Sequence, residues 1–246
     1  MSAVNHSRDR TVQRMFDRIA GRYDLLNRII SFRLDAWWRR QVINAVLTEG
    51  QPWILDIGTG TGDLVFEAAK VTQGNGTFVG LDFSLQMLQL ARAKQARTRR
   101  AAQTEFVLGS ALFTPFKDDA FDGAMSAFVL RNVSDLTLLF AEAFRVLKPG
   151  AKLVSLDMFP PKAGWFSALY AVYFHGLMPR IGALLARDRE AYKYLSDSVR
   201  RFYQPEQVTN LIEQAGFKPV TVRRFLSGAV CMHIANKPAR SGPSLA

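Results

Sequence analysis

A short glycine-rich stretch, LDIGTGTGD at residues 55–63, has the composition of a ligand-binding loop. Glycine allows the backbone to approach a bound molecule closely. The dinucleotide-binding fingerprint places its third glycine three residues after the second, whereas glycines here recur at every second position. The flanking acids, Asp56 and Asp63, would repel a pyrophosphate and attract a ligand with an ammonium and a sulfonium group, such as S-adenosylmethionine. We take Asp56, Gly58 and Gly60 as candidate contacts.

A further acid, Asp82, follows the next apolar run along the chain. A carboxylate at the end of a strand can accept hydrogen bonds from both hydroxyls of a ribose. The alternative role is a helix cap, but Ser84 already serves that purpose for the helix that follows. Met87, one turn into this helix, could pack on an adenine ring. The sequence therefore predicts a nucleoside site at Asp82 and Met87.

The elements that position these residues alternate between strand and helix. Residues 11–48 show helical spacing of apolar side chains, with Trp37 and Trp38 among them. Strands and helices then alternate to Asp157, and this order predicts a parallel sheet with helices on both faces. The expected strands are 53–57, 77–81, 105–108, 121–128 and 151–157, and the expected helices are 64–71, 85–96 and 138–147.

The alternation ends after Asp157. Residues 160–200 form an aromatic-rich insertion, and a helix at 204–215 with strands near 217–223 and 229–235 completes the fold. We expect one domain, 1–246, with a helical cap at 1–48 and a disordered tail from Pro238. Lys148-Pro149-Gly150 is typical of a turn.

Four sequence blocks resemble one family. They are MFDRIAGRYDLLN at 15–27, the glycine loop, LRNVSD at 130–135, and AYKYL at 191–195 leading to Phe202. The chain is similar in these blocks to the C-methyltransferases of menaquinone and ubiquinone biosynthesis, which are class I S-adenosylmethionine-dependent methyltransferases. The resemblance covers about residues 10–237. It implies a Rossmann-like, mostly parallel, seven-stranded sheet with helices on both faces.

The resemblance also implies cofactor contacts beyond those the spacing suggests. Many members have Asp or Asn where this chain has Ser110, and Gly where it has Val129. Ala127 stands where a Ser is often found. Residues carried over as cofactor contacts are Thr61, Asp82, Ser110, Ala111 and Ala127, with Tyr23 beside the methyl-transfer pocket.

Methylation of a reduced quinone on carbon needs a phenolate beside the target carbon. The enzyme must therefore supply a base or a bound water, and a cation that holds the phenolate. Arg131 is our candidate for this cation or for ordering the water, with a structural salt bridge as the alternative. His233 and Tyr194 are further catalytic candidates. The candidate acceptor contacts are Asn132, Asp157, His175 and Tyr194.

Composition sets the expected partners. Lys and Arg number 32 against 21 Asp and Glu, so the net charge is +11. Such a surface suits an anionic membrane or a nucleic acid. A nucleic-acid methyltransferase is disfavoured because Asn132 is not followed by the paired prolines of amino-group methylators. Cys231 lies within a strand, unlike a cytosine-attacking thiol, and one cysteine allows no internal disulfide.

We expect a prenylated quinol acceptor, with demethylmenaquinol preferred over a benzoquinol of the ubiquinone route. A different small-molecule acceptor and a non-enzymatic binding module remain open, as does a homodimer. Residues 163–186 could hold a prenyl tail, and Arg180, Arg187 and Arg189 could meet lipid head groups. The N-terminus lacks the apolar core of a signal peptide, so we expect a cytoplasmic protein that contacts the membrane peripherally. No metal is expected.

Overall fold

A seven-stranded sheet organises the computed structural model, which describes residues 3–31, 33–98, 103–161 and 189–240. The strand order is β3-β2-β1-β4-β5-β7-β6. Only β7 runs antiparallel to its neighbours, β5 and β6, so the mostly parallel seven-stranded sheet expected from the sequence is confirmed. The strands are β1 (Trp53–Ile57), β2 (Thr77–Asp82), β3 (Thr104–Leu108), β4 (Phe121–Ala127), β5 (Leu147–Met158), β6 (Val220–Phe225) and β7 (Val230–Asn236).

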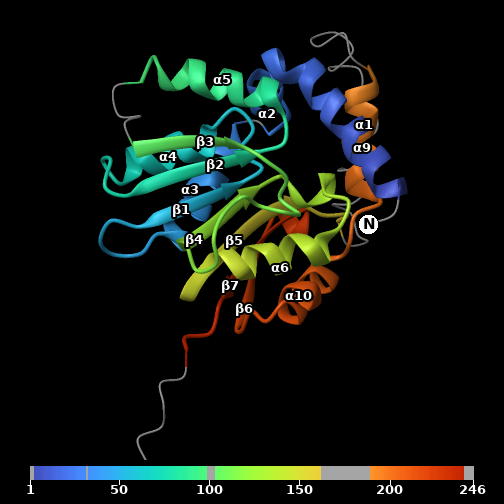
Figure 1. Ribbon diagram of the computed structural model, residues 1–246. Helices are drawn as coiled ribbons and strands as arrows, with labels where there is room; N and C mark the ends of the chain where they lie inside the picture. Colours follow the sequence, from blue (N-terminus) through green and yellow to red (C-terminus); the bar gives the residue numbers. More distant parts are fainter. Residues whose placement is uncertain (1–2, 32, 99–102, 162–188, 241–246) are drawn as a thin grey trace, which may run out of the picture.

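Helices cover both faces of this sheet, as Figure 1 shows. α3 (Leu34–Val46), α4 (Asp63–Val71) and α5 (Leu85–Gln95) pack on one face, and α6 (Leu136–Val146) and α10 (Pro205–Gln214) pack on the other. Successive strand residues point to opposite faces, so Ile54 packs beneath α3 while Leu55 packs beneath α6. Strands buried on both sides explain the unbroken apolar runs in the sequence.

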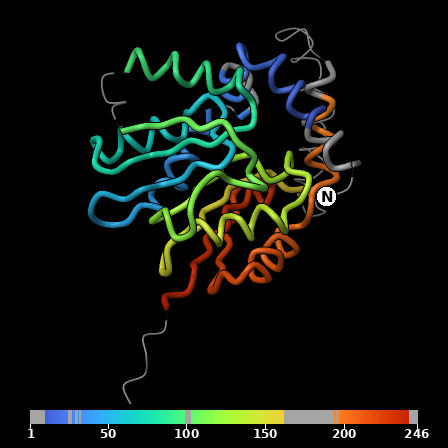
Figure 2. The backbone as a smooth tube through the Cα atoms, in the orientation of Figure 1, coloured from blue at the N-terminus to red at the C-terminus, as the bar shows by residue number. Residues whose placement is uncertain are grey.

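The N-terminal helices lie beyond the carboxyl ends of the central strands, on the right of Figures 1 and 2. They are α1 (Ala3–Ile19), the short 3-10 helix η1 (Ala20–Arg22) and α2 (Tyr23–Ile30). The Gln13 side chain donates to the Phe83 carbonyl at 2.8 Å, and Asp17 accepts from the Ser84 hydroxyl at 2.5 Å. Because Phe83 and Ser84 directly follow β2, α1 lies across the carboxyl end of that strand.

Two details differ from the sequence expectations. Lys148-Pro149-Gly150 lies inside β5 rather than before it, although Gly150 has a φ of 83° and the pairing register shifts between Phe121 and Gly123. The turn signal therefore marks an interruption of the ladder. Trp37 is half exposed, whereas its neighbour Trp38 is buried against the sheet. His175 and the expected tail groove at 163–186 lie outside the described residues.

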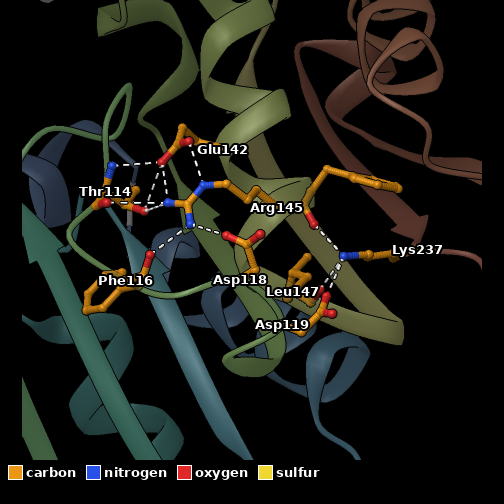
Figure 3. A network of polar contacts seen from close by, with 9 residues as sticks. Thr114, Phe116, Asp118, Asp119, Glu142, Arg145, Leu147 and Lys237 are labelled. Atoms are coloured by element: carbon orange, nitrogen blue, oxygen red, sulfur yellow. Dashed lines mark hydrogen bonds and ion pairs between the residues drawn. The ribbon is translucent and has the colours of Figure 1, made fainter.

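A charged network closes the amino edge of the sheet, where β4 and β5 begin and β7 ends (Figure 3). Arg145 contacts Glu142, Asp118 and the Phe116 carbonyl, and Lys237 bridges Asp119 and the Leu147 carbonyl. Arg145 lowers the pKa of Glu142 to about 2. This edge is therefore braced by paired charges and leaves the opposite edge for ligands.

Candidate active site

A cavity of about 590 Å³, including its open mouth, lies at the carboxyl ends of β1, β2 and β4. In open α/β sheets this edge is where ligands bind. Its walls come from the glycine loop, the end of β2, the segment after β4 and the N-terminal helices. The lining residues are Phe16, Tyr23, Gly58, Gly60, Leu81, Asp82, Phe83, Met87, Gly109, Ala111, Ala127, Phe128, Val129, Asn132 and Val133.

The glycine loop is shaped by conformations that side chains avoid. Gly58 and Gly60 have φ values of 72° and 57°. The amides of Gly58 and Thr59 donate to the Leu81 carbonyl, which fixes the loop against the end of β2. A Cβ on Gly58 would lie 2.6 Å from a methyl of Val129, so the loop is also in close contact with the segment after β4. Glycine at Gly58 thus makes this close contact sterically allowed.

Asp82 lies where the sequence predicted a ribose-binding acid. Its two oxygens accept hydrogen bonds from the amides of Gly60, at 2.7 Å, and Ser84, at 2.9 Å. Burial raises the pKa of Asp82 to about 6, although these backbone donors oppose the shift. The carboxylate is therefore held in a fixed orientation at the cavity wall.

Asp56 lies beneath the glycine loop and does not line the cavity. Its Oδ2 has no hydrogen-bond donor among the described residues. Burial, together with the nearby Asp82 carboxylate, raises the pKa of Asp56 to about 7. Two desolvated acids around the loop favour a cationic ligand. The cavity and its acids therefore fit S-adenosylmethionine, which carries a sulfonium and an ammonium group.

Thr61 connects the loop to the N-terminal helices instead of lining the cavity. Its hydroxyl donates to Asp24 at 2.6 Å and accepts from Lys94 at 2.8 Å. Lys94 also pairs with Asp24 at 2.5 Å and with Asp63 at 2.6 Å. This ionic cluster holds the start of α2 against the loop, and so positions Tyr23 at the cavity.

Some of the remaining cofactor candidates line the cavity and others do not. The cavity is lined by Met87, Ala111, Ala127 and Tyr23. Ser110 is exposed, and its hydroxyl accepts from the amide of Leu112. The neighbouring Gly109 and Ala111, and not Ser110, form the wall after β3.

Arg131 and Asp157 form a buried ion pair at the carboxyl ends of β4 and β5. Burial alone would lower the pKa of Arg131, but the Asp157 carboxylate, together with Tyr23 and Tyr194, raises it. Asp157 also accepts from the backbone amides of Arg131 and Met158. The Nε of Arg131 has no acceptor in the described part of the chain, and the guanidinium lies 5.7 Å from the ring centroid of Phe128. A permanent cation, whose Nε–H is a hydrogen-bond donor without an acceptor among the described residues, thus lies beside Phe128 in the wall of the cavity.

A second hollow, of about 1180 Å³ including open solvent, lies on the other side of η3 (Leu130–Asn132). It is lined by Arg131 and by Tyr194 of α9 (Arg189–Arg200), and Val133 borders both hollows. The Tyr194 hydroxyl donates to the Asn132 Oδ1 at 3.2 Å. The two residues predicted to contact the methyl acceptor are therefore hydrogen bonded to each other. Arg131, Asn132, Asp157 and Tyr194 therefore gather around η3.

His233 lies elsewhere. Its ring is buried on β7, with Nε2 at 3.1 Å from the Pro205 carbonyl and its centroid 5.7 Å from that of Phe159. Burial lowers the pKa of His233 to about 4, and it lines neither hollow. Within the described part of the chain, the contacts of His233 are those of a packed side chain.

Sequence reasoning missed several apolar walls of the cavity. Phe83 directly follows Asp82, and Phe128 directly follows Ala127. Both could have been predicted as cavity residues from their position directly after a candidate residue at the end of a strand. Phe16 lies in the first sequence block but had no role assigned to it. Val129 was noted only as a departure from the family.

This fold, with a glycine loop after β1 and an acid ending β2, defines the class I methyltransferases that use S-adenosylmethionine. A family model described as the ubiE/COQ5 methyltransferase family matches residues 3–237. The chain therefore belongs to the ubiE/COQ5 methyltransferase family and is an S-adenosylmethionine-dependent methyltransferase.

Named relatives extend over nearly the whole chain. It is 39% identical to a demethylmenaquinone methyltransferase of Thermus thermophilus, over 91% of this chain and 100% of the relative. It is 40% identical to one of Deinococcus radiodurans, over 92% of both chains. A solved S-adenosylmethionine-dependent methyltransferase of Thermotoga maritima, titled a possible histamine N-methyltransferase, shares the fold with a TM-score of 0.62. It is 21% identical and covers 92% of this chain and 99% of its own.

Within the described residues, no helix combines the length and apolar character needed to cross a bilayer. The same residues contain no cluster of His, Cys, Asp and Glu that could hold a metal ion.

Proposed function

We propose that this enzyme transfers a methyl group from S-adenosylmethionine to the ring carbon of a prenylated naphthoquinol, converting demethylmenaquinol to menaquinol. The proposal is supported by relatives of that name that align with nearly all of this chain. The observation that carries it is the buried Arg131–Asp157 pair between the cofactor cavity and the second hollow. A fixed cation at this boundary suits an acceptor that reacts as an anion.

The cofactor supplies an electrophilic methyl group on its sulfonium. The protein needs only to hold that group in line with the acceptor carbon. Gly58 and Gly60 would bring the backbone against the cofactor, Asp82 would accept hydrogen bonds from the ribose hydroxyls, and Met87 would pack on the adenine. Tyr23 closes the methyl end of the cavity.

The acceptor carbon becomes nucleophilic when the hydroxyl beside it loses its proton. We assign to Arg131 the role of holding the resulting phenolate through its unpartnered Nε. A bound water takes the hydroxyl proton, and transfer of the methyl group to the ring carbon would release S-adenosylhomocysteine. The methylated carbon then gives its hydrogen to water as a proton, which restores the aromatic ring as a phenolate, and protonation of that phenolate gives the quinol with a net release of one proton. Asn132 and Tyr194 orient the acceptor through their shared hydrogen bond.

Asp157 acts through Arg131. Its carboxylate is fully buried and bound to the guanidinium and to two backbone amides, so it positions the cation rather than the acceptor. His233 has no part in this proposal, because its ring is buried against Pro205.

The test is transfer of labelled methyl from S-adenosylmethionine to reduced demethylmenaquinone, with the oxidised quinone and a reduced benzoquinone precursor alongside. We expect turnover with the reduced naphthoquinone only. Arg131→Lys keeps the charge but loses Nε, and Arg131→Ala loses both, so activity should fall in that order while cofactor affinity changes little. Arg97→Ala, at an exposed arginine after α5, is the control. Faster turnover of the benzoquinol, or an unaffected Arg131→Ala enzyme, would contradict the assignment.

A further inference from the structure

An exposed apolar patch lies where the start of α3 meets the turn between β6 and β7. Leu34 and Trp37 of α3 are 39% and 49% exposed, and Leu226 in that turn is 43% exposed. The rings of Trp37 and Phe225 meet edge to face, with centroids 5.3 Å apart. We call Leu34, Trp37, Phe225 and Leu226 the Trp37 patch. Its members come from distant parts of the chain and form one surface.

The Trp37 patch lies at the same edge of the sheet as the cofactor cavity. Phe225 and Met158 both pair with Val230, and Met158 ends β5 at its carboxyl end. On α3, the adjacent Trp38 packs against Phe128, with ring centroids 6.2 Å apart, and Phe128 lines the cavity. The patch is thus one aromatic contact away from the cavity wall.

Exposed arginines surround this edge. Arg33 precedes α3, and Arg223 lies two residues before Phe225, on the same face of β6. No acidic side chain in the described ranges pairs with either of them. The α1–η1 segment adds a row of exposed arginines at four-residue spacing, which places them along one side of the helix. The row consists of Arg10, Arg14, Arg18 and Arg22.

The amino edge is different. There Arg145, Lys148, Lys237 and Arg240 each pair with an acidic side chain (Figure 3 shows the Arg145 and Lys237 contacts). These cations at the edge far from the cavity are paired, whereas Arg33 and Arg223, beside the exposed apolar residues of the Trp37 patch, pair with no acidic side chain in the described residues. The charge arrangement therefore gives the molecule one face suited to an anionic, partly apolar surface.

We propose that the Trp37 patch docks on an anionic phospholipid bilayer, with Trp37 in the interfacial layer and Arg33 and Arg223 on head-group phosphates. Tryptophan favours this layer, and arginines beside it gain from the negative surface potential. The inference rests on the proposed function in one respect, since a prenylated quinol partitions into lipid and must enter from it. A second copy of the chain fits less well, because a two-fold interface on this patch would bring like charges together.

The experiment is sedimentation of the full-length protein with phosphatidylcholine vesicles, with and without phosphatidylglycerol, in the absence of any quinol. Trp37→Ser is compared with Trp53→Ser, because Trp53 is also 49% exposed but starts β1 at the amino edge. We expect Trp37→Ser to weaken binding to the anionic vesicles about tenfold and Trp53→Ser to leave it unchanged.

Charge is tested in the same way. Arg33→Gln and Arg223→Gln should each weaken binding to the anionic vesicles about fivefold, whereas Arg240→Gln, at the amino edge, should not. Unchanged S-adenosylmethionine affinity shows that each variant is folded. Equal losses from Trp37→Ser and Trp53→Ser, or equal binding to neutral and anionic vesicles, would overturn the proposal. So would a concentration-dependent dimer that Trp37→Ser abolishes, because the second copy would then be the occupant.

Methyl transfer to a quinol without a long tail separates this inference from the proposed function. Vesicle binding without methylation of any quinol would leave docking standing and refute the function. Methylation of the short quinol by a protein that does not bind anionic vesicles would support the proposed function and refute the docking proposal.

Discussion

Replacing Gly58 with alanine should destabilise the protein through two separable effects. The residue has a φ of 72°, and a side chain in that conformation costs about 1–2 kcal/mol. The new Cβ would also lie 2.6 and 2.7 Å from the two methyls of Val129, and overpacking of this kind costs about 1–3 kcal/mol. The total predicted loss is about 2–5 kcal/mol in the free energy of unfolding.

Gly60→Ala is the matched control. Gly60 lies in the same loop with a φ of 57°, but its nearest neighbour would be a ring carbon of Tyr23 at 3.8 Å, an ordinary contact. Only the cost of placing a side chain at positive φ applies, so Gly60→Ala should lower the free energy of unfolding by about 1–2 kcal/mol. Urea unfolding of the cofactor-free protein measures both variants.

A double-mutant cycle with Val129→Ala then isolates the contact. Removing the two methyls should recover the overpacking part of the Gly58→Ala loss, so the two changes should couple favourably by about 1–3 kcal/mol. Strict additivity would refute the reasoning, because it would mean that Val129 does not set the cost at Gly58. A Gly60→Ala loss as large as that of Gly58→Ala would refute it equally.

Three further predictions concern the buried charges of the site. Asp82, to which we assign the ribose hydroxyls as hydrogen-bond donors, has a pKa of about 6. The affinity for S-adenosylmethionine, measured by calorimetry, should therefore fall as the pH drops below about 6, and Asp82→Asn should bind the cofactor weakly without that pH dependence. The pKa of Asp56 is about 7 in the folded protein against an ordinary 3.8, so the unfolded chain loses this proton at a lower pH than the folded protein does. The free energy of unfolding should therefore fall as the pH rises from about 3.8 to about 7. Asp56→Asn should remove that fall in urea titrations, and an unchanged pH profile would contradict the prediction. Asp157→Asn leaves the Arg131 guanidinium buried without its partner and should cost about 3–5 kcal/mol in thermal unfolding. The control Asp197→Asn, at a partly exposed ion pair with Arg200, should cost under about 1 kcal/mol, and similar losses from the two variants would argue against a buried pair.

Local patterns were sufficient to predict the sheet and several of the residues that line the cavity. Gly58, Gly60, Asp82 and Met87 are close to one another in the sequence, and their positions follow from one strand-loop-helix unit after another. The order of elements determined which strand ends would meet, because parallel strands end at a common edge.

Contacts between distant segments were not predictable in this way. Thr61 fits the family's cofactor pattern, yet its hydroxyl donates a hydrogen bond to Asp24, which lies on α2. Arg131 and Asp157 were both singled out, but nothing in their spacing shows that they would pair. His233 has a residue type suited to catalysis, and only the packing of β7 against Pro205 shows that its ring is buried away from both hollows.

The attachment of the N-terminal helices has a consequence for how ligands exchange. Phe16 and Tyr23 form part of the cavity wall, yet their segment joins the body of the protein through side chains, at Ser84 and in the ionic cluster of Asp24 with Lys94. Movement of this segment would widen the cavity while the sheet stays intact. Since ionic contacts weaken with salt, the attachment of the segment at Asp24 and Lys94 should loosen as ionic strength rises. The strength of this ionic cluster therefore affects how firmly Phe16 and Tyr23 are held at the cavity wall.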